Sequence, residues 1–143
     1  MAKSTTGFTL WKLTALWQRN LAEVLGEFEI TQTQFAILAA MIGFEKDGQD
    51  VTQALLVAQT NIDKMTISKS VRGLQDKKLV KIKKSKTDKR ANNLELYAKG
   101  KKVADTAIVA VAKADEKFFA GITSNQVDSL NKLGEKVISA LES

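Results

Sequence analysis

The sequence predicts a mainly α-helical fold that includes one small β-hairpin. Through most of the 143 residues, apolar side chains recur at spacings of three or four, which is typical of amphipathic helices. Only residues 79–83 and 94–97 change to the period of two that is typical of strands. The chain has no proline, which suits long helices. We expect a single domain over residues 1–143, because this length is close to the commonest domain size.

The first helix is expected over residues 8–28. Its apolar stripe, spaced by three or four residues throughout, consists of Leu10, Leu13, Trp17, Leu21, Val24 and Phe28. Trp11, Leu16 and Leu25 widen this stripe beyond what one core face needs. The excess apolar surface indicates contact with a partner helix, such as one from a second subunit.

Two later helices begin with the same signal. Thr31 is expected to cap a helix, with Gln34 as the third residue of a capping box, and this helix ends before the loop at 47–50. Thr123 and Gln126 repeat the pattern at the start of the last helix. That helix places on one face Val127, Leu130, Leu133, Val137 and Leu141.

Residues 52–77 have the pattern of a helix-turn-helix. A short helix over 52–58 precedes Asn61, which tolerates the left-handed backbone of a tight turn, and Asp63, a good N-cap. The second helix, from Lys64 to about Lys77, turns inward Ile67, Val71 and Leu74. In this motif the second helix enters the major groove of DNA. Its outward residues are then candidates for DNA contacts: Lys64, Met65, Thr66, Ser68, Lys69 and Arg72.

The next stretch predicts a β-hairpin and a long helix. Residues 79–83 alternate, with Val80 and Ile82 on one side and lysines on the other. Residues 84–93 form a polar, charged loop, and residues 94–97 return as the second strand. After Gly100 a long helix is expected to run towards Gly121.

The positive charge of the chain is concentrated in this hairpin and the residues that flank it. Residues 77–102 contain eleven basic and two acidic residues, a net charge of +9. The whole chain is only +6, so the remainder carries −3. A local cluster of this kind is typical of a surface that binds a polyanion.

Composition argues against several classes of protein. With no cysteine and no histidine, the chain lacks disulfides, thiolate catalysis and the commonest general base and metal ligand. It also shows no phosphate-binding glycine loop and no paired-carboxylate site, so we expect no enzymatic activity, metal or cofactor. No apolar run approaches the ~18 residues that cross a bilayer, and the first residues do not form a secretory signal. We therefore expect a cytoplasmic protein with no membrane partner.

Several short motifs resemble those of the MarR (multiple antibiotic resistance regulator) family of winged helix-turn-helix transcription factors. The resemblance spans nearly the whole chain. It is carried by Thr52, Gln53, Leu56, Met65-Thr66-Ile67-Ser68-Lys69, Leu74, Leu79, Val80, Asp88, Lys89, Arg90, Leu96 and Gly100. It implies N- and C-terminal dimerisation helices at about 8–28 and 98–143, and a DNA-binding lobe at 30–97 whose wing is 80–97.

The resemblance also implies functional residues. The wing would contact DNA through Lys84, Lys86, Asp88, Lys89 and Arg90, with Arg90 in the minor groove and Asp88 orienting it. The homodimer interface would use Leu10, Leu13, Trp17, Phe118, Leu130, Leu133, Val137 and Leu141. A pocket for a small aromatic or anionic effector would involve Phe8, Trp11, Phe35 and Tyr97.

Three residues depart from the family's pattern. Lys69 stands where arginine is usual, which removes the bidentate fork that recognises guanine. Lys78 stands where glycine is frequent. Tyr97 replaces a helix-capping threonine, so the start of the long helix can differ.

Taken together, these features predict a regulator of transcription that binds double-stranded DNA sequence-specifically, a repressor that a small molecule releases. Two alternatives stay open. A winged helix can instead bind RNA or another protein. A sequence-neutral architectural protein would bind all DNA alike through the charge of its wing.

Overall fold

The computed structural model describes residues 5–84 and 92–143, and these ranges contain six helices and one antiparallel hairpin. In chain order the elements are α1 (Thr6–Gly26), α2 (Gln32–Lys46), α3 (Gln53–Thr60), α4 (Lys64–Asp76), β1 (Val80–Lys84), β2 (Asn92–Leu96), α5 (Ala98–Phe118) and α6 (Ser124–Glu142). This order confirms the predicted fold class, a mainly α-helical winged helix-turn-helix. None of the helices in the described ranges is both long and apolar enough to span a bilayer.

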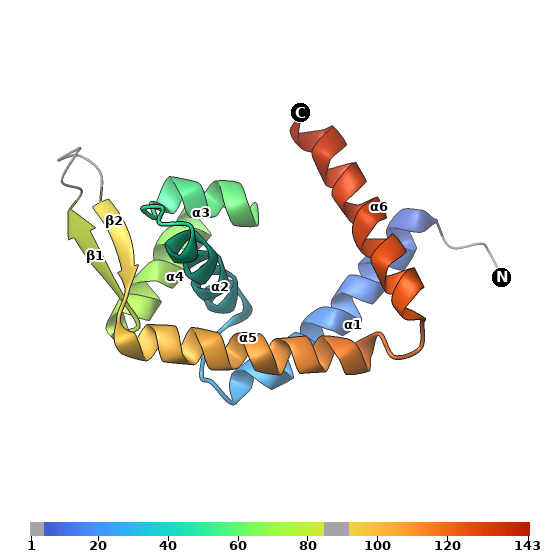
Figure 1. The fold of residues 1–143 in the computed structure, drawn as a ribbon, viewed down its shortest axis with the longest axis horizontal. Coiled ribbons are helices and arrows are strands. Elements are labelled where there is room, and N and C mark those ends of the chain that lie inside the picture. The colour runs from blue at the N-terminus through green and yellow to red at the C-terminus, as the bar shows by residue number, and fades with distance from the viewer. Residues whose placement is uncertain (1–4, 85–91) are drawn as a thin grey trace.

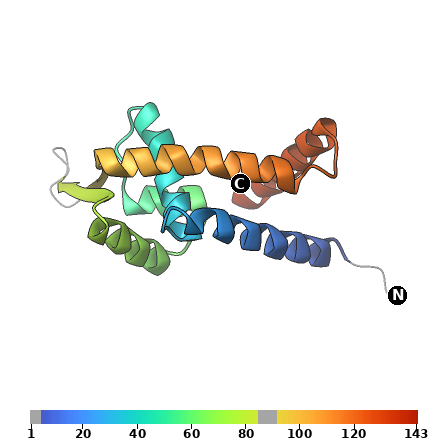
Figure 2. The same ribbon diagram turned by 90° about the horizontal axis from the view of Figure 1, so that it is seen from below.

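The long helix α5 connects two parts of the molecule (Figure 1). Near its N-terminal end, α2, α3, α4 and the hairpin form a lobe. The helix α1 lies beside α5, as both views show (Figures 1 and 2). At the other end of α5 the chain turns into α6, which leaves α5 at an angle, leans back in the direction of the lobe and ends at the C-terminus (Figure 1).

One hydrophobic core joins the lobe to α1 and α5. Its most deeply buried side chains come from the lobe and from α1: Leu25, Ile37, Leu38, Met41, Val51, Leu56, Ile67, Val71, Leu74 and Val80. Ala104 and Ala107 let α5 approach this core closely. The predicted inward face of α4 is confirmed, because its three residues are at most 1% exposed. Burial of each such side chain contributes roughly 1.5–3 kcal/mol.

The predicted capping boxes at the starts of α2 and α6, and the predicted turn after α3, are also confirmed. The Thr31 hydroxyl accepts from the Gln34 amide at 3.1 Å, and the Gln34 side chain accepts from the Thr31 amide at 3.1 Å. Thr123 and Gln126 form the same reciprocal pair at 3.1 and 2.9 Å. Asn61 has the expected left-handed backbone, with φ 59°. These signals are local, which is why the sequence alone reveals them.

Two element bounds differ from those that the apolar pattern alone predicts. The long helix begins at Ala98, the bound that the family resemblance implies, whereas the apolar spacing alone predicts a start after Gly100. Tyr97 occupies the N-cap position with extended backbone, and its side chain makes no capping hydrogen bond. Lys84, Asn92 and Asn93, which the sequence places in a polar loop over 84–93, belong to the strands, since β1 reaches Lys84 and β2 begins at Asn92. Val80 and Ile82 share one side of β1 as predicted; Val80 is buried and Ile82 is 43% exposed, because the outer half of the hairpin extends beyond the core.

The last helix has an apolar face that no other described part of this chain covers. No residue of α6 is buried. The exposed fractions are 41% for Leu130, 63% for Leu133, 59% for Val137 and 80% for Leu141. The predicted stripe is therefore present, but within one chain it faces solvent.

Candidate nucleic-acid interface

The outward face of α4 carries a compact group of polar and basic side chains. Because its inward face is fully buried, the orientation of this helix in the lobe is fixed. The sequence predicts six contact residues on the outward face of this helix. The structure puts all six on α4, with Ser68 half-buried and the others exposed: Lys64, Met65, Thr66, Lys69 and Arg72.

The first turn of α4 is fixed by its N-cap. Asp63 accepts from the Thr66 amide at 2.9 Å and from the Thr66 hydroxyl at 2.7 Å. The hydrogen bond from the Thr66 side chain, together with that from its amide, lowers the pKa of Asp63. Thr66 therefore has a defined rotamer, with its proton donated to Asp63 and its oxygen lone pairs open to a donor on DNA.

The hairpin is held at a fixed position by a close approach of α5 to Leu79. The Tyr97 amide donates to the Leu79 carbonyl at 3.0 Å. Gly100 passes so near that a Cβ atom there would lie 2.0 Å from the same carbonyl oxygen. Only glycine fits this contact, which places the base of the hairpin against the first turn of α5.

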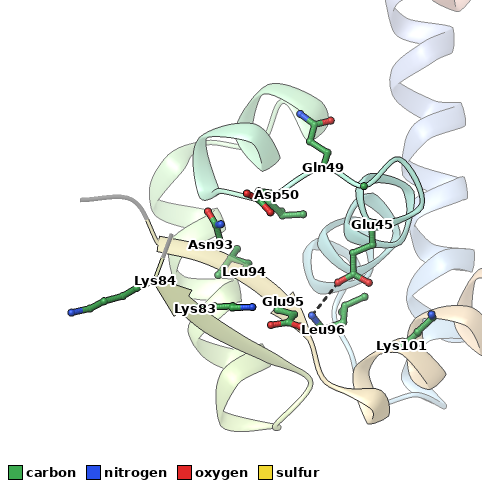
Figure 3. Close-up of a pocket in the computed structure, with 12 residues that line it drawn as sticks. Glu45, Gln49, Asp50, Lys83, Lys84, Asn93, Leu94, Glu95, Leu96 and Lys101 are labelled. Atoms are coloured by element: carbon green, nitrogen blue, oxygen red, sulfur yellow. Dashed lines mark hydrogen bonds between the residues drawn. The ribbon is translucent and has the colours of Figure 1, made fainter. Parts of the chain in front are cut away.

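A second set of contacts secures the outer edge of β2 (Figure 3). The Leu94 amide donates to the Val51 carbonyl at 2.7 Å, which forms an isolated antiparallel bridge to the segment before α3. The Leu96 amide donates to the Glu45 carboxylate at 3.3 Å. These contacts tie the hairpin to α2 and to the segment that leads into α3.

The hairpin carries part of the predicted basic wing. Lys81, paired with Glu95 at 3.7 Å, lies 5.5 Å from the centre of the Tyr97 ring. Lys83 and Lys84 are exposed on β1. The other predicted wing residues lie in 85–91, outside the described residues: Lys86, Asp88, Lys89 and Arg90.

One basic residue of the charged stretch turns towards the protein. Lys77, at the C-cap of α4, donates to the Glu29 carbonyl and to Gln34 Oε1, the latter at 3.2 Å. Glu29 has a left-handed backbone, with φ 57°. This contact links the end of α4 to the turn between α1 and α2. Sequence reasoning missed it, because nothing in the local pattern distinguishes Lys77 from the lysines that follow.

The four predicted effector-pocket residues do not line one cavity within a single chain. Trp11, which is 76% exposed, lines a shallow hollow of about 440 Å³ on α1. Phe8 is exposed near the start of the same helix, and Phe35 packs against the core. Tyr97 caps α5 next to the hairpin, at the opposite end of the molecule from the start of α1 (Figure 1).

A larger hollow, of about 740 Å³, lies between the hairpin, the end of α2 and the start of α5 (Figure 3). Carboxylates and lysines both line it, namely Glu45, Asp50, Glu95, Lys83, Lys84 and Lys101. It adjoins the Glu45–Leu96 contact that holds β2.

The predicted dimer residues lie on α1, α5 and α6. Leu10 is 62% exposed and Leu13 is half-buried. Trp17 ties α1 to α5 by donating to the Asp115 carboxylate at 2.9 Å. Phe118 is half-buried and packs edge-on against Phe119. The members on α6 form its exposed apolar stripe.

A family model and a known relative both match most of the chain. Residues 26–113 match the family model described as ArnR1-like, winged-helix domain. The chain is 37% identical over 119 residues to the uncharacterized HTH-type transcriptional regulator YdcH of Bacillus subtilis (strain 168), covering 82% of this chain and 80% of that protein.

Two solved structures show the same fold. A mutant of MarR from E. coli complexed with operator DNA aligns with a TM-score of 0.81 and 21% identity over 92% of this chain and 91% of that one. BpsR of Bordetella bronchiseptica, in a structure that addresses regulation of its DNA binding by 6-hydroxynicotinic acid, aligns with a TM-score of 0.83 and 16% identity over 94% and 93% of the two chains. The fold that the resemblance to the MarR family implies is confirmed. The chain therefore belongs to the ArnR1-like winged-helix family of helix-turn-helix transcriptional regulators and has the MarR fold.

Proposed function

We propose that this protein is a cytoplasmic, homodimeric repressor that binds a specific double-stranded DNA sequence and is released by a small acidic ligand. The observation that carries the proposal is the outward face of α4, rigidly seated on the core and directly joined to a lysine-rich hairpin. Hydroxyl and cationic side chains on this face match base edges and phosphates of the major groove.

The hairpin extends the contact to the neighbouring backbone or minor groove. In the proposed complex Lys84, Lys86, Lys89 and Arg90 contact phosphates or the groove floor, and Asp88 orients Arg90. The bridge from Leu94 to Val51 keeps this wing in register with α4. Residues 30–97 then act as one DNA-binding lobe within a single domain of 143 residues.

Dimerisation follows from the apolar surfaces of α1 and α6. An exposed, contiguous apolar stripe is unfavourable in water and marks an interface. A two-fold dimer through these helices presents two copies of α4 to successive major grooves, roughly 34 Å apart. Release by a ligand requires only that the ligand favour a different spacing of the lobes. The regulation of BpsR by 6-hydroxynicotinic acid supports a small acid as the effector. Its proposed site is the hollow on α1 that Trp11 lines, close to exposed Phe8.

The test is fluorescence anisotropy with two labelled duplexes at two salt concentrations. One duplex is the region upstream of the protein's own gene and the other is a scramble of equal composition. We expect at least roughly 10³-fold tighter binding to the upstream duplex. The variant Arg72→Ala should weaken binding, while Lys113→Ala, on the distal half of α5, serves as the matched control.

Other outcomes identify the rival functions. Equal binding of both duplexes that fades together with salt would indicate a sequence-neutral architectural protein. Absence of binding even at low salt would favour a module for RNA or protein. If transcription from the upstream region rises when the protein is added, the protein is an activator and not a repressor.

A further inference from the structure

We infer that Met65 determines specificity by packing its thioether side chain on the C5-methyl group of a thymine in the major groove. This inference rests on the proposed function and names one base feature that the site recognises. Met65 is 83% exposed, the highest fraction among the large hydrophobic side chains of the described residues. A side chain of this kind gains free energy when an apolar partner covers it.

The position of Met65 on α4 points it towards bound DNA. Leu74 follows Met65 by nine residues, which at about 3.6 residues per turn is two and a half turns. Met65 therefore lies opposite the fully buried Leu74. Lys69 and Arg72 follow it by four and seven residues and share its face. Met65 is thus at the centre of the outward face.

Met65 also lies in the first turn of α4, and in helix-turn-helix proteins the N-terminal residues of the second helix contact base edges. The Asp63 cap holds this turn through its two hydrogen bonds from Thr66. The Met65 side chain is therefore presented from a fixed backbone, while its unbranched thioether can adapt to the groove.

The chemistry of the groove selects thymine. Along the major groove, guanine, cytosine and adenine present hydrogen-bonding groups, and thymine adds a methyl group. The neighbouring Lys64, Thr66 and Lys69 can satisfy polar edges, whereas Met65 would leave such an edge unpaired, which is costly. A scattered exposed apolar residue is common on protein surfaces, but this one is the apolar member of an otherwise polar and basic face.

Selection from a pool of random duplexes tests the inference and identifies the preferred sequence in the same experiment. The wild-type protein, Met65→Leu and Met65→Gln are each used to enrich sequences. Each thymine of the wild-type consensus is then replaced by deoxyuridine, which removes only the C5-methyl group. Binding of the resulting duplexes is measured by anisotropy for all three proteins.

We expect one thymine in each half-site whose replacement weakens wild-type binding about fourfold, the factor that corresponds to about 0.8 kcal/mol for one buried methyl group. Met65→Leu should keep this sensitivity, because leucine is also apolar. Met65→Gln, of similar length but polar, should lose it and should accept cytosine at that position.

The possible results distinguish a failure at Met65 from a failure of the proposed function. A specific consensus with no methyl-sensitive thymine, or with equal sensitivity in Met65→Gln, would overturn the role of Met65 and leave sequence-specific binding intact. A selection that enriches no sequence would overturn specific binding and the role of Met65 with it. Thermal melts of Met65→Gln, expected to match those of the wild-type protein, check that the variant is folded.

Discussion

Gly100 lies where the first turn of α5 passes the backbone of Leu79. A Cβ atom at this position would lie 2.0 Å from the Leu79 carbonyl oxygen and 2.8 Å from its carbonyl carbon. Both are backbone atoms, so no side-chain rotation can relieve the overlap. Glycine at position 100, which matches the family pattern, is therefore required for a steric reason. The sequence motif alone does not reveal this reason.

Replacement of Gly100 by alanine should consequently destabilise the fold. We expect Gly100→Ala to lower the free energy of unfolding by at least about 2 kcal/mol, because the base of the hairpin must move away from α5. Gly43→Ala in α2 is the control, since nothing lies within 4 Å of its added methyl group. That variant should gain about 0.5–1 kcal/mol from helix propensity. Urea denaturation measures both, and equal loss in the two variants would contradict the steric argument.

Lys77 and Lys78 each have a structural role that the sequence does not indicate. Lys78 has φ 58°, a left-handed backbone, which explains why glycine suits this position. Lys77 looks like one more cation of the basic stretch, yet it bonds to Glu29 and Gln34. Local composition predicted the charge of this segment, whereas the direction of each lysine depends on distant backbone that no local pattern contains.

At the scale of the elements, the stability of the first turn of α4 depends on the ionisation of its N-cap residue, Asp63. Hydrogen bonds from Thr66 lower the pKa of Asp63, so the folded state favours the carboxylate. The stabilisation of the folded state by ionised Asp63 is complete above the ordinary carboxylate pKa. It is lost as the pH falls through the lowered pKa of Asp63 in the folded state. Asp63→Asn keeps a capping side chain without this titration.

We therefore expect the wild-type protein to have a higher melting temperature than Asp63→Asn at neutral pH, with a difference that shrinks on acidification. Circular dichroism melts over a pH series measure this difference. Thr66→Val removes the hydroxyl donor and should reduce the pH dependence of an otherwise wild-type chain. If the difference between the wild-type protein and Asp63→Asn stays constant in acid, the cap carboxylate contributes no pH-dependent stability.

The elements themselves were predictable where their signals are local. Capping boxes located α2 and α6, the turn at Asn61 located α3 and α4, apolar spacing located α1, and the period-two stretch located both strands, all to within a few residues of their observed bounds. Apolar spacing alone began α5 only after Gly100, because its N-cap residue, Tyr97, offers no capping side chain, whereas the family resemblance implied the observed start at 98. The bridge from Leu94 to Val51 joins residues far apart in sequence, so no spacing rule indicates it.

At the scale of the whole molecule, the exposed apolar face of α6 indicates that a second chain covers it. Amphipathic spacing predicted the stripe, but its members are exposed because no other described element of the same chain buries it. Together with exposed Leu10 and Trp11 on α1, it supplies two apolar surfaces at the end of the molecule away from the lobe (Figure 1). In the proposed dimer these surfaces cover each other and set the distance between the two copies of α4.

A charge placed in this stripe should therefore separate the subunits. We expect Leu133→Asp to be monomeric at micromolar concentration, because dimerisation would bury an unpaired carboxylate. Asn131→Asp adds the same charge beside the stripe and should remain dimeric. Analytical ultracentrifugation measures both, and circular dichroism checks that both stay helical. The monomer should also lose affinity for a two-half-site duplex while retaining weak binding to one half-site, since α4 and the hairpin are unchanged. A Leu133→Asp protein that stays dimeric would place the interface away from α6.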